Sequence, residues 1–84
     1  MVTHLVERVQ TGVRLEKRLL LVLKALAQLR GMSLGDLLEG IVLHALEGKQ
    51  PFSPGTRREI EDLKRLYGLH LPASASHKLV EKKR

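Results

Sequence analysis

One alternating stretch constrains the fold of this chain more than any other feature. From Val9 to Leu15, apolar or β-branched residues occupy the odd positions, whereas polar residues or glycine occupy the even ones. Period two is typical of a β-strand with one apolar face. The 84 residues contain no second stretch of comparable quality, and an unpaired strand exposes a row of backbone donors and acceptors. We therefore expect this strand to pair with the same strand of a second copy, antiparallel about a two-fold axis.

Two helices are predicted after the strand. The first covers residues 17–29, and its apolar stripe is wider than one small partner can cover, which favours burial on two sides. Gly31 is expected to end it in the left-handed conformation, and Ser33 to cap a second helix over residues 34–47. Apolar positions of the strand and of both helices form the predicted dimer core: Val13, Leu15, Leu19, Val22, Leu23, Leu26, Leu34, Leu38, Ile41 and Val42.

A third helix is predicted beyond a connector that contains two prolines. Ser53 is its expected N-cap, with Thr56 as a rival cap, Pro54 its first residue, and Gly68 its end. A helix this short needs support, so it should pack on the other helices or meet a protein partner. The predicted organisation is an N-terminal arm (1–8), a strand and two helices (9–48), a connector and third helix (49–68), and a basic, disordered tail (69–84).

Composition and charge narrow the class of protein. The net charge is +6, and its basic excess lies in residues 17–31 and in the C-terminal third. Such a distribution attracts a polyanion, although a solvated surface is the alternative explanation. Aromatic residues make up only 2% of the chain, so the core must be aliphatic. Without cysteines the chain has no disulfides, which suits a reducing cytoplasm. The start of the chain lacks a signal peptide, and no apolar run can span a bilayer, so we expect no membrane partner.

Nothing in the sequence predicts catalysis. The four histidines lie in four separate segments, and no two of them have the spacing of metal ligands. No nucleophile, base and orienting group occur together, and no glycine-rich phosphate loop is present. We therefore expect a protein that is not an enzyme and uses no cofactor or metal.

The order of elements resembles the ribbon-helix-helix family of bacterial DNA-binding proteins. The likeness is carried by Thr11-Gly12-Val13-Arg14-Leu15, the apolar helix after it, Gly31-Met32-Ser33, and the stripe of Leu38 and Val42. It covers about 40 of the 84 residues. The resemblance implies a mainly α fold with a third C-terminal helix, in which an intertwined homodimer inserts a two-stranded antiparallel ribbon into the major groove.

The resemblance also assigns DNA contacts. The outward positions of the ribbon, Gln10, Gly12 and Arg14, correspond to the places from which side chains reach base edges. Arginine suits guanine and glutamine suits adenine, whereas Gly12 has no side chain for direct readout. Phosphate contacts are expected from Arg8 and from the start of the second helix: Ser33, Leu34 and Gly35. Asp36 departs from this pattern, because its carboxylate competes for the same amides.

These observations favour a cytoplasmic bacterial repressor that binds double-stranded DNA with sequence preference, as a homodimer or a dimer of dimers. One alternative is an antitoxin whose third helix and tail bind a toxin. Another is a dimeric interaction protein that does not bind DNA. Two residues support this alternative: Gly12, which has no side chain to contact a base, and Asp36, which competes for the phosphate-binding amides.

Overall fold

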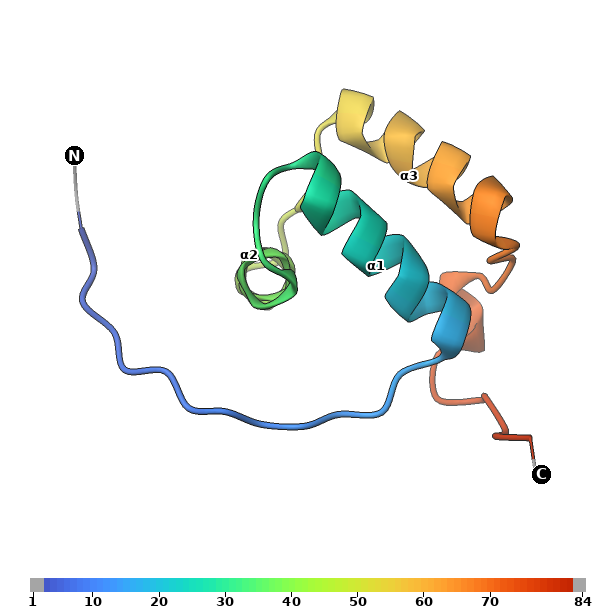
Figure 1. Ribbon diagram of the computed structural model, residues 1–84, viewed down its shortest axis with the longest axis horizontal. Coiled ribbons are helices and arrows are strands. Elements are labelled where there is room, and N and C mark those ends of the chain that lie inside the picture. The colour runs from blue at the N-terminus through green and yellow to red at the C-terminus, as the bar shows by residue number, and fades with distance from the viewer. Residues whose placement is uncertain (1–2, 83–84) are drawn as a thin grey trace.

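The computed structural model describes residues 3–82 and contains three α-helices and one short 3-10 helix (Figure 1). The helices are α1 (Lys17–Leu29), α2 (Leu34–Leu46) and α3 (Pro54–Tyr67), and the 3-10 helix is Ala73–Ala75. Met1 and Val2 of the predicted arm, and Lys83 and Arg84 of the predicted basic tail, lie outside the described residues.

The predicted ribbon is wrong. Residues 3–82 contain no strand, and the stretch from Val9 to Leu15 runs as an extended segment without secondary structure. The physical reason is that a strand needs a partner for its backbone ladder, and no second segment among residues 3–82 supplies one. The intertwined ribbon-helix-helix dimer is therefore corrected to a small, mainly α-helical chain of three helices. Residues 3–15 are called the extended segment below.

Each of the three α-helices begins at a residue whose side chain caps its first turn. Ser33 accepts a hydrogen bond from the Asp36 N–H (3.1 Å) at the start of α2, and Ser53 accepts one from the Thr56 N–H (3.2 Å) at the start of α3. Both caps confirm the predictions, and Thr56 is not the cap of α3. The cap of α1 was not predicted. Glu16 accepts a hydrogen bond from the Leu19 N–H at 2.8 Å.

Glycines end the helices in the left-handed conformation. Gly31 follows α1 with φ +66°, and Gly68 is the C-cap of α3 with φ +69°. Residues with a Cβ resist this conformation, so both predicted stops are confirmed. Helix α2 ends at Leu46, one residue earlier than predicted, and Glu47 is its C-cap.

The core lies around α1, which packs against both other helices. Figure 1 shows α3 alongside α1 in the opposite direction, whereas α2 crosses them and is seen nearly end-on. Leu26, Ala27 and Leu37 form the buried centre, and Leu26 is only 1% exposed. Partly buried apolar side chains from every helix and from the connector surround this centre: Leu23, Met32, Ile41, Phe52, Ile60 and Leu63.

Candidate nucleic-acid interface

The extended segment holds all three residues predicted to contact bases. It passes around the side of α2 that faces away from α1 (Figure 1). Gln10, Gly12 and Arg14 are all exposed, and the Arg14 side chain remains 83% exposed. The apolar residues Val9 and Val13 of the same segment are exposed as well.

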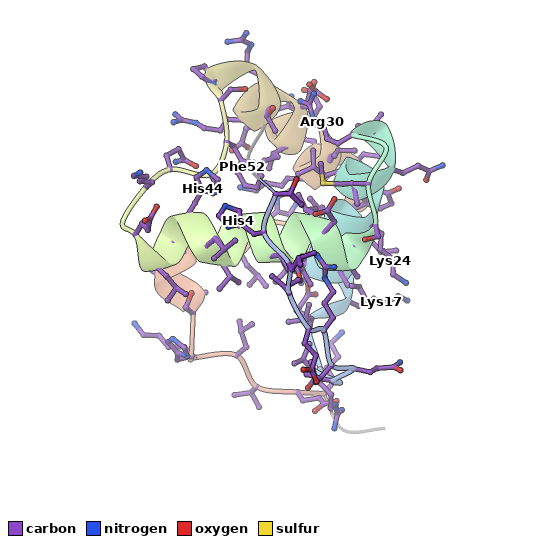
Figure 2. The ribbon with its side chains drawn as sticks, turned by 90° about the vertical axis from the view of Figure 1, so that its left-hand side faces the viewer. His4, Lys17, Lys24, Arg30, His44 and Phe52 are labelled. Carbon is purple, nitrogen blue, oxygen red and sulfur yellow. The ribbon has the colours of Figure 1, made fainter. Side chains whose placement is uncertain are left out.

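Arg8 joins the extended segment to α2. Its Nε and Nη2 atoms each donate to a carboxylate oxygen of Glu39 on that helix, both at 2.9 Å. These hydrogen bonds hold the pKa of Glu39 below its usual range and raise the pKa of Arg8. Figure 2 shows the segment crossing α2, in agreement with this contact. Sequence reasoning could not find the pair, because 31 residues separate its members.

The second group of predicted phosphate contacts lies at the start of α2. The first N–H groups of a helix have no partner within it, and Leu34 and Gly35 occupy these positions after the Ser33 cap. Asp36 places a carboxylate in the same turn, where it suits the positive end of the helix. Within residues 3–82, no hydrogen bond or ion pair joins Ser33, Leu34 or Gly35 to the extended segment.

The cations of α1 and of its C-cap, Arg30, differ in whether they contact other parts of the chain. Arg18 donates to Glu16 (2.8 Å) and to the Gly68 carbonyl (3.1 Å), so it ties α1 to the end of α3. Arg30 donates to Thr56 and Glu59, both at 2.6 Å, and fastens α1 to the start of α3. These two arginines stabilise the fold, a role that the sequence did not reveal because their partners on α3 lie far along the chain.

Lys17 and Lys24 are the cations of α1 besides Arg18. They are seven residues apart and share one face of the helix, on the right of the molecule in Figure 2. Both residues are exposed, and within the described part of the chain neither forms an ion pair. They add positive charge to the surface without taking part in packing.

The predicted dimer core is only partly buried in a single chain. Val22 and Leu26 are buried, and four other members are half-buried: Leu23, Leu34, Leu38 and Ile41. The rest are exposed: Val13, Leu15, Leu19 and Val42. Helix α2 also exposes Leu43 and Leu46, the latter by 79%. Leu37 is its one buried residue, so the apolar face of α2 continues beyond the core into solvent.

A shallow cavity of about 310 Å³ lies between α1, α2 and the connector. Its lining is mostly apolar and includes Leu37 and Phe52, together with the polar residues Asp36 and His44. The His44 Nδ1 atom lies 2.7 Å from the Gly40 carbonyl, so this histidine is engaged with its own helix. Across residues 3–82, no three His, Cys, Asp or Glu side chains are grouped as metal ligands.

Comparison with known proteins gives no relative, since no protein-family model, curated protein or solved structure matches the chain. None of the helices within residues 3–82 has the length and apolar character needed to cross a membrane.

Proposed function

We propose that this chain binds double-stranded DNA as a homodimer and acts as a transcriptional repressor by occupying preferred sites. The observation that carries the proposal is the extended segment. Gln10 and Arg14 are exposed along it, Arg8 keeps 68% of its side chain exposed beside Glu39, and the apolar residues Val9 and Val13 are exposed as well. A chain that exposes both kinds of side chain along one segment is suited to meeting two partners at once, a polyanion and an apolar surface.

The polar side chains of the extended segment suit DNA chemically. Guanidinium groups donate in a fork that matches phosphate or the major-groove edge of guanine, and the glutamine amide matches adenine. Gly12 removes one side chain from the middle of this row, so the proposed preference rests on Gln10 and Arg14. Lys17 and Lys24 supply general attraction through counterion release. The start of α2, with Ser33, Leu34 and Gly35, is a further proposed phosphate contact.

The proposed second copy covers the apolar face of α2. Small monomeric proteins seldom expose contiguous apolar patches, and Val42, Leu43 and Leu46 lie together on the last turns of this helix. A small chain also buries a limited share of its surface alone, which association relieves. In this proposal the two chains pair through α2, and each contributes one extended segment to the DNA.

The resemblance to ribbon-helix-helix proteins supports the proposal through its second half alone. Helix α1, the turn at Gly31 and helix α2 occur in the order of that family. The ribbon itself is not part of what we propose. The proposed setting is a bacterial cytoplasm, where a chain without cysteines needs no oxidising compartment.

The test is a titration of the protein against random-sequence duplex DNA at several salt concentrations. We expect tight binding at low salt that falls steeply as salt rises. The steepness is the slope of log affinity against log salt concentration. Arg14→Ala should lower the magnitude of this slope by about one for each phosphate that the arginine neutralises in the wild type. Arg57→Ala, which removes the same charge from the exposed face of α3, is the matched control and should retain the wild-type salt dependence. Failure of the wild type to bind at low salt would overturn the proposal.

A further inference from the structure

The two arginines of the extended segment are both held by carboxylates of the same chain. Arg8 forms a two-pronged contact with Glu39 on α2, with both donor–acceptor distances at 2.9 Å. Arg14 is paired with Glu81 of the C-terminal segment. Residues 9–13 therefore lie between two ion pairs that fasten the segment to separate parts of the molecule.

These contacts use the atoms that DNA would need. The Nε and Nη2 edge of Arg8 donates two parallel hydrogen bonds to a planar carboxylate, and the same edge binds a phosphate in the same two-pronged manner. One edge serves one such anion at a time. Glu39 thus occupies the position that a phosphate oxygen pair would take.

We propose that Glu39 and Glu81 compete with DNA for Arg8 and Arg14, so that the free protein keeps its extended segment tied to its own chain at these two residues and releases it on binding DNA. This inference rests on the proposed function and adds a regulatory step to it. The segment is autoinhibited by its own chain, and DNA binding replaces a carboxylate of the protein by a DNA group at each guanidinium.

The exposure of the pairs sets the size of the effect. Both partners of each pair are largely open to solvent, and exposed ion pairs of this kind are weak. A weak contact is readily displaced by the dense charge of DNA, which a buried pair would resist. Neutralising Glu39 should therefore strengthen DNA binding by about twofold to fivefold.

The experiment uses the full chain with Glu39→Gln, which keeps the shape of the side chain and removes its charge. Glu47→Gln is the matched control, because Glu47 is the C-cap of α2 and pairs with Lys49 instead of the extended segment. Two properties are measured, the affinity for duplex DNA and the rate of trypsin cleavage after Arg8. We expect Glu39→Gln to raise both more than Glu47→Gln does, and the double variant with Glu81→Gln to raise the affinity further.

Each outcome decides a different point. If Glu39→Gln and Glu47→Gln behave alike in both measurements, the inference is overturned, and the change reflects net charge alone. If cleavage accelerates in Glu39→Gln but DNA affinity does not rise above the control, Glu39 holds the segment without competing with DNA, and the inference again fails. If no variant binds DNA, the competition falls together with the proposed function, whereas the cleavage rates still report on the contact itself.

Discussion

The two sides of α1 differ in how completely they are covered. On one side lies α3, a helix rich in charge, whose few apolar residues Ile60 and Leu63 pack on the core. On the other side lies α2, which is far more apolar, yet only its Leu37 is buried. Helix α3 has no buried residue, but it is polar and exposes Leu66 as its one large apolar side chain, whereas α2 exposes Val42, Leu43 and Leu46. The difference indicates that the α3 side stabilises the chain and the α2 side is available for association.

The largest expected effect is on the free energy of unfolding, from a substitution in the core around α1. Leu26→Ala should lower the free energy of unfolding by about 3 kcal/mol, because it removes a fully buried side chain and leaves a cavity. Urea denaturation followed by circular dichroism measures the change. Leu43→Ala on the exposed face of α2 is the control and should have little effect at low protein concentration. Equal destabilisation by both variants would show that the outer face of α2 is packed as completely as the core.

The next effect concerns association. Val42 is 51% exposed on α2, and Val42→Glu should weaken self-association at least about tenfold, because a charge would be buried in the proposed interface. Sedimentation velocity over a range of concentrations measures this. Leu66→Glu places the same charge at an exposed leucine of α3 and should leave self-association unchanged. A wild-type chain that stays monomeric at every concentration would remove the role given to α2.

The end of α3 offers a smaller and sharper test. Gly68 has φ +69° and its carbonyl accepts from Arg18. Gly68→Ala should destabilise the chain by about 1 kcal/mol, because a Cβ is strained in the left-handed conformation. Gly12→Ala in the extended segment, where φ is not positive and no atom lies near a Cβ, should be close to neutral. Thermal unfolding measures both variants, and equal melting temperatures for Gly68→Ala and Gly12→Ala would contradict this expectation.

The smallest effect is a pH dependence at the start of α1. The hydrogen bond from Arg18, followed by that from the Leu19 N–H, lowers the pKa of Glu16 below its usual range. Since the folded pKa lies below the unfolded one of about 4.3, this stability is present above a pH of about 4.3 and is lost as pH falls through the folded value. Glu16→Gln should reduce the acid sensitivity of unfolding between about pH 5 and 3, by less than about 1 kcal/mol. Acid unfolding curves that are identical for Glu16→Gln and the wild type would contradict this account.

The helices could be predicted because their signals are local. Apolar spacing, the caps at Ser33 and Ser53, and the glycines that follow each helix all lie within a few residues of what they determine. Pairing is not local in this way, and the prediction of a strand at residues 9–15 failed because alternation shows what a segment can do and not whether a partner exists.

The contacts of the candidate interface were harder to predict for the same reason. The Arg8–Glu39 and Arg30–Glu59 pairs join residues about thirty positions apart, and no sequence pattern links them. Within α3 as well, partners three and four residues away compete: Arg65 pairs with Asp62, and Lys64 with Glu61. Side-chain partners depend on rotamers that helical spacing alone does not determine.

The most direct test of DNA binding by a pair of chains is the number of chains bound to one short DNA duplex. Sedimentation equilibrium with a labelled duplex gives this number for the wild type and for Val42→Glu. We predict two chains in the smallest wild-type complex, and much weaker binding by Val42→Glu because its chains cannot pair. One chain per duplex, with Val42→Glu binding as tightly as the wild type, would contradict the claim that a pair of chains formed through α2 is the unit that binds DNA.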